Sequence, residues 1–499
     1  MAIFGFHFVL SLIAVTVFSK INSRFSICEW AVIRGLYYYL LQSSIVPNIK
    51  SFNGKEQKRR RRNGSALAED DAAADRLVRV PLSVAALDGV PFLGFLLWTY
   101  NYFVFALAIF VVSDLFGLLF PANLDRNTSV IWLVCALFFF LHVLFHLTAV
   151  KLAVRELRAE RNVLVCFAAV LFLGALVLVM FGDAFLDVDI GGGYTALIAA
   201  LDDVLATRAF GFTAIGPTTT MASESPVSGS VPQASPLLFL VALAVILTLI
   251  GTTLLFPVFQ YAGQYVELAE RLDERSPIKF TLHASFFLPL FIFLLYTNPV
   301  KEHFMRTSGE FSEPLLPDWP LSSISSDALD ALRVAFVIVW AALRCSVARL
   351  HLQAFLDQPL AKAMEWRHEA NHHHHLSADE KRTKIAYYAS YFCAAALQYF
   401  LPVFVTLSTA LLLKHLGAIE FTTLLGWFTP STSPPTAANN ATATTSGSRA
   451  LDAFLSARTQ KPLWTLCLAT LLGMQAALAA IGVIFKRVDA DAVSATRRH

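Results

Sequence analysis

The sequence predicts an all-α, polytopic membrane protein with about nine transmembrane helices. Of its 499 residues, 56% are hydrophobic and only 15% are charged, and the mean hydropathy is +0.59. A water-soluble chain of this length carries more polar residues than that. The apolar residues also gather in runs of about 20, the length that an α-helix needs to cross the hydrocarbon layer. The net charge of +3 is too small to indicate a nucleic-acid partner.

Nine apolar runs are the predicted spans, so the lipid bilayer is the first predicted partner. They cover residues 2–18, 98–119, 130–149, 162–182, 236–257, 281–299, 331–350, 386–413 and 463–485. Residues 30–46 form a shorter run, in which Arg34 lies between a tryptophan and three tyrosines. Such a run is typical of a helix at the membrane surface. Apolar residues before the second span predict a further surface helix over 86–97.

The first span is predicted to remain as an uncleaved anchor with the N-terminus outside. The alternative is a cleaved signal peptide, but the segment lacks a basic n-region and a small-residue cleavage site. With the N-terminus outside, the inner segments carry 29 of the 39 Lys and Arg residues and the outer segments carry 8. This bias agrees with the rule that cytoplasmic loops are positive, so the C-terminus is predicted to be cytoplasmic. The sequons at Asn127 and Asn440 then lie outside as glycosylation candidates, and the short loop around Asn127 favours Asn440.

The orientation divides the chain into seven segments. They are the anchor helix 1–18, a cytoplasmic basic and acidic segment 19–97 with interfacial helices, a three-helix membrane segment 98–182, an outer and partly disordered loop 183–235, a four-helix membrane segment 236–413, an outer low-complexity loop 414–462, and the last span with its cytoplasmic tail 463–499. Within the first outer loop, "YTALIAALDDVLATRAF" predicts an amphipathic helix at the outer surface. The charged inner linkers are predicted to prolong the spans as helix.

A basic cluster marks the first cytoplasmic segment. It consists of Lys55, Lys58, Arg59, Arg60, Arg61 and Arg62. Such a cluster binds anionic lipids, with about 1 kcal/mol gained for each basic residue near the surface. The alternative, which we favour, is a solvated determinant of topology.

The sequence predicts neither an enzyme nor a cofactor or metal site. HExxH, GxSxG and Walker A motifs are missing, and the six cysteines include no CxxC pair. His142 and His146 share one helix face at metal-ligand spacing, but no third ligand is evident, which favours hydrogen-bonded interior histidines. The histidine run at 372–375 is interpreted as part of a solvated loop.

Two arginines inside the seventh span are the strongest functional candidates. Only ten residues separate Arg333 from Arg344, about 15 Å of helix in a hydrocarbon layer about 30 Å thick, so at least one lies below the headgroups. Either both snorkel toward the two surfaces, or they face the bundle interior and need partners. Asp114 in the second span is placed at the depth of Arg333, and we predict that the two form an ion pair. Arg349 is predicted to mark the cytoplasmic end.

Polar and helix-breaking residues in two other spans complete the candidate set. These are His283 and Pro289 in the sixth span, and Gln398 and Pro402 in the eighth. A proline leaves a backbone carbonyl free, which a polar side chain can satisfy. Kinks of this kind suit a cavity or gate, and they also occur as plain packing features. The arginine spacing does not match a voltage sensor, which carries Arg at every third position.

The stretches "LHASFFLPLFIFLLYTNPV", "LRCSVARLHLQAFL" and "LQYFLPVFVTLSTALLLKHLG" resemble the transmembrane protein 161 family. The preceding "LLFPVFQYA", the N-terminal anchor, Asp114 and Arg333 fit the same pattern, whereas the loops differ in length and composition. The resemblance implies a non-enzymatic multi-pass protein linked to cation currents and membrane excitability, notably cardiac rhythm. A second branch of the family is linked to oxidative-stress and DNA-damage responses.

Three functions follow as hypotheses. The leading one is a regulator of ion-channel activity with a cation channel as partner. The second is a channel or transporter that uses Arg344, Gln398 and the Pro289 and Pro402 kinks along its path. The third is a structural, trafficking or stress-response protein of the membrane. The plasma membrane is favoured over the endoplasmic reticulum, and no KDEL-type retrieval signal is present.

Overall fold

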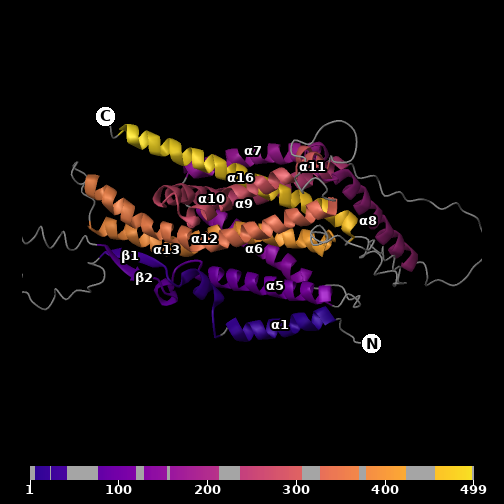
Figure 1. The fold of residues 1–499 in the computed structure, drawn as a ribbon, viewed down its shortest axis with the longest axis horizontal. Helices are drawn as coiled ribbons and strands as arrows, with labels where there is room; N and C mark the ends of the chain where they lie inside the picture. Colours follow the sequence, from indigo (N-terminus) through magenta and orange to yellow (C-terminus); the bar gives the residue numbers. More distant parts are fainter. Residues whose placement is uncertain are drawn as a thin grey trace, which may run out of the picture.

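The protein is a bundle of long α-helices with one small sheet, seen in a computed structural model (Figure 1). The structure describes residues 6–22, 24–41, 77–119, 129–153, 158–212, 236–305, 326–369, 378–422 and 456–496. Eight of the described helices are long and apolar enough to cross a membrane. They are α5 (Leu93–Leu119), α6 (Val130–Ala153), α7 (Arg158–Phe185), α9 (Pro236–Arg271), α10 (Pro277–Leu295), α12 (Ser326–Glu369), α13 (Ala378–Leu416) and α16 (Ala457–Thr496). The predicted polytopic helical fold is confirmed.

The first predicted span is the ninth apolar helix, α1 (Phe6–Asn22), which is shorter than the other eight. Several spans run further than their apolar runs, as the charged linkers predict. Helix α9 continues through Arg271, and Ser276 then caps α10 by accepting a hydrogen bond from the amide of Ile278. Because Pro277 occupies the first turn of α10, where no intrahelical N–H bond is needed, it fits without distortion.

The two ends of the bundle carry different elements (Figure 1). One end, here the hairpin end, carries β1 (Tyr37–Leu41) and β2 (Leu77–Pro81). The other, here the α8 end, carries α8 (Ile190–Phe212) and α11 (Asn298–Met305). Helix α1 begins at the α8 end and α16 ends at the hairpin end. The sequence predicts that the hairpin end is cytoplasmic, and this orientation stays a prediction.

The predicted surface helices over 30–46 and 86–97 are wrong. In the described part of the first, which ends at Leu41, a π-helical turn forms over Glu29–Ile33, and β1 then pairs with β2 in antiparallel register. Gly35 adopts a φ of +91°, which ends the helical turn, and the aromatic "YYYLL" that follows suits a strand. In the second, a 3-10 turn over Val84–Leu87 precedes α5, which begins at Leu93.

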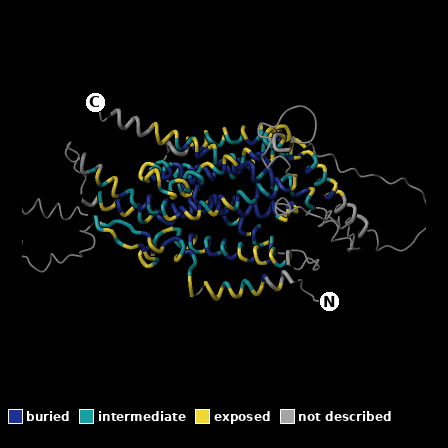
Figure 2. The backbone as a smooth tube through the Cα atoms, viewed as in Figure 1, coloured by how far each residue is buried: buried dark blue, intermediate teal, exposed yellow. Residues whose placement is uncertain are grey.

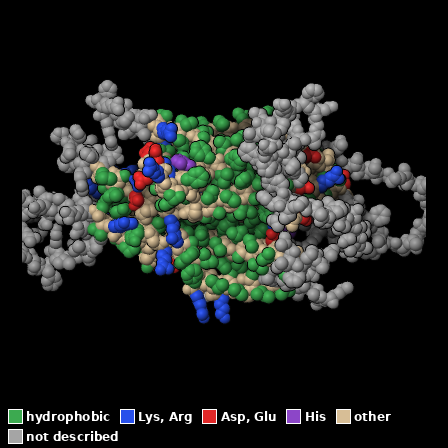
Figure 3. Space-filling model, viewed as in Figure 1, with side chains coloured by type: hydrophobic (Ala, Val, Ile, Leu, Met, Phe, Trp, Pro, Cys, Tyr) green, Lys and Arg blue, Asp and Glu red, His purple; other side chains and the backbone are tan. Residues whose placement is uncertain are grey.

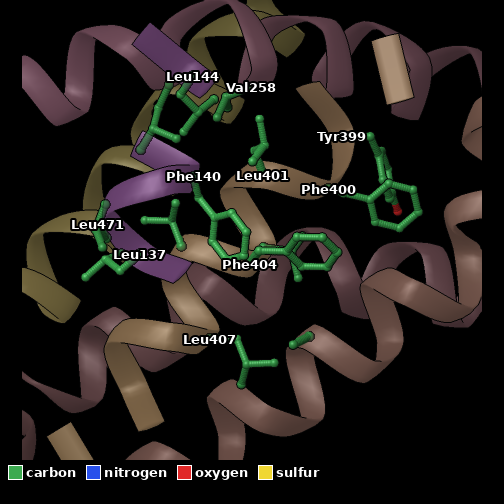
Figure 4. Packing of buried hydrophobic residues seen from close by; sticks show 14 of the residues in the cluster. Leu137, Phe140, Leu144, Val258, Tyr399, Phe400, Leu401, Phe404, Leu407 and Leu471 are labelled. Carbon is green, nitrogen blue, oxygen red and sulfur yellow. The ribbon is translucent and has the colours of Figure 1, made fainter. Parts of the chain in front are cut away.

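Helix α13 lies at the centre of the bundle. The most apolar 18-residue stretch of α13 is entirely buried, and the helix packs against α5, α6, α9, α12 and α16. Phe404 stacks on Phe103 of α5 at 3.9 Å between ring centroids and also packs against Phe140 of α6 (Figure 4). Figure 2 shows that the buried residues follow this central layer, whereas α1 is mostly exposed. The axis of the bundle is therefore filled by closely packed side chains.

Large apolar side chains cover the middle of the face that Figure 3 shows. Phe138 of α6, Val170 of α7 and Leu249 of α9 are 69%, 64% and 56% exposed, which is costly in water and favourable in lipid. Charged side chains gather toward the two ends. Only 17% of the most apolar 18-residue stretch of α7 is buried, so α7 lies at the lipid-facing edge of the bundle. This surface identifies the bilayer as the protein's surrounding medium.

Small residues allow α9 and α16 to approach closely. A Cβ atom added to Gly482 of α16 would lie 2.8 Å from the Cβ of Ala262 in α9, closer than side chains tolerate. Membrane helices use small residues for such contacts because packing, rather than water exclusion, holds them together. The backbone separation of α9 and α16 is therefore set in part by this glycine.

We expect Gly482→Leu to destabilise the bundle by about 1–3 kcal/mol, because the added side chain must push α16 away from α9. The measurement is thermal unfolding of the purified chain, followed by tryptophan fluorescence. Ala480→Leu is the matched control, since Ala480 is on the same helix but exposed. Equal melting temperatures for the two variants would contradict the close packing of α9 and α16.

Candidate functional site

Arg333 lies buried at the α8 end in a network of charges. Its guanidinium is 1% exposed and Nη1 donates to Asp187 at 2.8 Å and to Asp330 at 2.7 Å. Nε and Nη2 both donate to the carbonyl oxygen of Leu295, at 3.0 Å and 2.6 Å. Asp330 precedes Arg333 by one helical turn on α12, whereas Asp187 comes from the segment between α7 and α8. The arginine therefore joins three elements through satisfied bonds.

Two lysines complete the Arg333 network. Lys301 of α11 pairs with Asp187 at 2.5 Å, and Lys461 of α16 pairs with Asp330 at 2.7 Å. Burial raises the pKa of Asp187, but hydrogen bonds from Lys301 and Arg333 lower it by more, so its pKa lies below the ordinary value. The negative charge on Asp187 is thus stabilised by the folded state.

We expect Asp187 to make stability depend on pH. Because its pKa is lower in the folded state, its contribution is present above the unfolded pKa of about 3.9 and is lost as the pH falls through the folded pKa. Melting temperatures of the wild type and of Asp187→Asn, taken between about pH 5 and pH 2, check this. The wild type should lose more stability over that range, and parallel curves would contradict the assignment.

The predicted ion pair between Asp114 and Arg333 is wrong. Asp114 pairs instead with Lys414 near the end of α13. Arg333 already has two carboxylates, Asp187 and Asp330, and neither lies in α5. The depth of Asp114 was a poor guide to its partner because depth does not tell which helices are neighbours.

Arg344 lies inside the bundle among aromatic rings, and it is only 4% exposed. Its guanidinium carbon is 3.3 Å from the ring centroid of Tyr261, 5.1 Å from that of Tyr399 and 5.8 Å from that of Trp340. These rings come from α9, α13 and α12 respectively. The faces of aromatic rings are negative and attract a cation, so the rings form a cage for the positive charge. We call these residues, together with His351, the Arg344 pocket.

Hydrogen bonds hold the aromatic rings of the pocket in place. Tyr399 donates its hydroxyl hydrogen to the carbonyl oxygen of Arg344 at 2.7 Å. Trp340 Nε1 donates to the carbonyl oxygen of Ser285 at 3.0 Å. That carbonyl is available because Pro289, four residues later on α10, has no N–H to donate to it. The free carbonyl that Pro289 leaves on α10 thus holds one wall of the pocket in place.

His351 lies seven residues after Arg344, on the same face of α12, and is 0% exposed. Its ring is 4.9 Å from that of Tyr261 and 5.1 Å from that of Tyr399, so both tyrosines contact it and Arg344 alike. In the part of the chain that the structure describes, neither ring nitrogen of His351 has a hydrogen-bond partner, and the same is true of Arg344 Nε. The pocket therefore combines a fixed positive charge with unsatisfied polar atoms.

The other predicted candidates, His283, Gln398 and Pro402, are not part of the Arg344 pocket. His283 bonds through Nδ1 to the hydroxyl of Tyr265 at 2.8 Å. Gln398 donates to the hydroxyl of Tyr391 at 3.2 Å, and its side-chain oxygen has no partner among the described residues. Thr406 donates to the carbonyl of Pro402 and receives a hydrogen bond from Gln475 of α16. The turn of α13 that follows Pro402 is thus hydrogen-bonded to a neighbouring helix.

Arg349 is exposed and donates to the backbone carbonyls of Ala31 and Trp30, at 2.9 Å and 3.0 Å. It connects α12 to the π-helical turn near the hairpin end. Arg333, Arg344 and Arg349 therefore have three different roles on one helix. The first is paired with carboxylates, the second is held by aromatic rings, and the third binds backbone carbonyls at the bundle surface.

Several predicted features lie outside the described residues. They are the basic cluster at 55–62, the sequons at Asn127 and Asn440, and the histidine run at 372–375. Of the paired histidines, His146 lies against the rings of Phe92 and Phe95. The described residues bring together no group of three or more His, Cys, Asp or Glu side chains that could hold a metal.

The sequence did not predict several residues of the Arg333 network and of the Arg344 pocket. Asp330 and His351 could have been found, because each is on the buried face of the arginine helix, at spacings of three and seven residues. Tyr261, Tyr399 and Asp187 carried no signal. Tyrosines occur throughout the spans, and the neighbours of α12 cannot be deduced from one sequence.

Comparison with known proteins agrees with this architecture. Residues 2–477 match the family described as "Predicted transmembrane protein 161AB", which is nearly the whole chain. No solved structure matches the fold. The chain belongs to the transmembrane protein 161 family of multi-pass membrane proteins.

Proposed function

We propose that this membrane protein regulates the activity of a cation channel, and thereby membrane excitability, without conducting ions or catalysing a reaction itself. The observation that supports this is the filled axis of the bundle. A conducting path needs a water-lined route, whereas the centre here is occupied by α13, whose most apolar 18-residue stretch is entirely buried. We propose cation currents in particular because the transmembrane protein 161 family is linked to them.

A regulator acts through contacts with its partner inside the bilayer. The exposed apolar faces of α7 and α10 are available to lipid and to the spans of another protein. A role of this kind requires a plasma-membrane location, which is therefore part of the proposal.

The test is whole-cell voltage clamp in excitable cells that lack the chain, with the wild type restored. We expect the amplitude or voltage dependence of a cation current to change on restoration. Ala480→Leu, which alters only an exposed position, should act like the wild type, and Gly482→Leu, which disturbs α9 and α16, should act weakly. Unchanged currents with folded wild-type protein at the cell surface would contradict the proposal.

A second function, a channel or transporter, is favoured by one observation. Arg344 places a positive charge inside the bundle, and such residues often lie on ion pathways. The two functions differ in whether the chain alone moves ions across a sealed membrane.

A further inference from the structure

The Arg344 pocket contains a buried cation that has no carboxylate partner among the residues that the structure describes. Arg344 forms no ion pair within the described part of the chain, whereas Arg333, on the same helix, has two carboxylates. A buried charge is tolerated when it is paired and hydrogen-bonded. The aromatic faces offset part of the cost, but they accept no hydrogen bond of ordinary strength from Nε. Among the described residues, Arg344 therefore has no carboxylate to balance its charge and no acceptor for Nε.

His351 adds a second unsatisfied group to the same pocket. A neutral imidazole has one N–H donor and one acceptor, and both nitrogens of His351 lack partners among the described residues. Arg344 and His351 are both in contact with the rings of Tyr261 and Tyr399. A fixed positive charge and buried polar atoms without partners, on residues that contact the same two rings, are the features of a site that accepts a negative ligand.

We propose that the Arg344 pocket binds a small monovalent anion such as chloride. Arg344 supplies the charge and the Nε donor, and His351 supplies a second N–H donor. A single positive charge is balanced by a monovalent ion. A water molecule could bridge the same donors, but it would leave the charge uncompensated. The inference is independent of channel regulation, because it concerns the chemistry of one pocket.

The closure of the pocket limits the size of the ligand. Arg344 and His351 are 4% and 0% exposed, and Trp340, Tyr261 and Tyr399 are 1%, 4% and 4% exposed. A lipid phosphate with its attached chains does not fit such a closed site. The ion must also lose most of its water, and the aromatic walls do not replace that hydration fully. We therefore expect bromide, which is more weakly hydrated than chloride, to bind at least as tightly, and fluoride to bind poorly.

The test is chloride binding to the purified full-length protein in detergent, with gluconate replacing chloride at constant ionic strength. Line broadening of the ³⁵Cl NMR signal reports binding directly, and the melting temperature reports it through linkage, because a ligand that binds only the folded state stabilises it. We expect saturable broadening that bromide displaces. Arg344→Gln should weaken binding by about tenfold or more, as expected for loss of a charge-assisted bond. Arg349→Gln, the matched control at an exposed arginine, should bind as the wild type does.

Each result decides the proposal. Saturable binding that is lost in Arg344→Gln and kept in Arg349→Gln supports it. No saturable binding to folded wild-type protein overturns it, as does unchanged binding in folded Arg344→Gln. If Arg344→Gln does not fold, His351→Phe replaces it, and binding unaffected by that change would equally overturn the assignment of the pocket.

Discussion

Replacing Arg333 by methionine is expected to lower the free energy of unfolding by about 3–5 kcal/mol, the usual cost of removing one partner from a buried charge network. The substitution leaves the carboxylate of Asp330 without its buried partner and leaves the carbonyl of Leu295 without its two donors. The side-chain volume changes little, so the loss measures the charge and its hydrogen bonds. Chemical or thermal unfolding of the purified protein provides the measurement.

Lys301→Gln is the control for that experiment. It removes a cation from the same network, but Lys301 is 30% exposed and Asp187 keeps its bond to Arg333. A partly exposed pair of this kind contributes about 0–1 kcal/mol. If Arg333→Met were no more destabilising than Lys301→Gln, Arg333 would not hold α10, α12 and the segment between α7 and α8 together.

Replacing Arg344 by methionine is expected to raise the free energy of unfolding, whereas replacing Arg333 lowers it. In chloride-free buffer it should stabilise the protein by about 1 kcal/mol or more, since burying the charge costs at least about 2.5–3.5 kcal/mol and the nearest aromatic face returns about 2 kcal/mol. The guanidinium cannot snorkel out of the bundle, because it is 4% exposed. Melting temperatures in gluconate buffer make the comparison.

Arg344→Lys is the matched control, because it keeps the charge and loses the planar guanidinium. It should not be stabilised. Adding chloride should narrow the difference between the wild type and Arg344→Met, since only the wild type gains from the anion. A lower melting temperature for Arg344→Met in chloride-free buffer would show that the protein itself compensates the charge of Arg344. That result would contradict an anion site in the pocket.

The spans could be predicted from the sequence because their apolar runs have the length that the bilayer demands. The short sheet could not. The tyrosine-rich 37–41 segment suits both an interfacial helix and a strand, and its partner β2 lies beyond a polar segment, more than 30 residues away. Pairing over that separation depends on how the hairpin end folds, which local pattern does not show.

The candidate site was predictable in part. Depth within a span placed Arg333 and Arg344 inside the membrane, and their burial agrees with the interior alternative over snorkelling. Depth failed for the partner of Arg333, because Asp187 lies in a connection after α7 and its position depends on the arrangement of α8, α11 and α12. The aromatic pocket was not predictable, since its walls come from three helices that are far apart in the sequence.

Ion flux through the purified chain, in sealed liposomes under an imposed voltage, tests whether the protein is a regulator that does not itself conduct ions. Gramicidin added at the end shows that the vesicles are intact and responsive. A non-conducting regulator, with α13 filling its axis, should give no flux above that of empty vesicles, although its protein is folded. Cation or anion flux that disappears with Arg344→Gln would contradict this and make the chain a channel or carrier with Arg344 on its path.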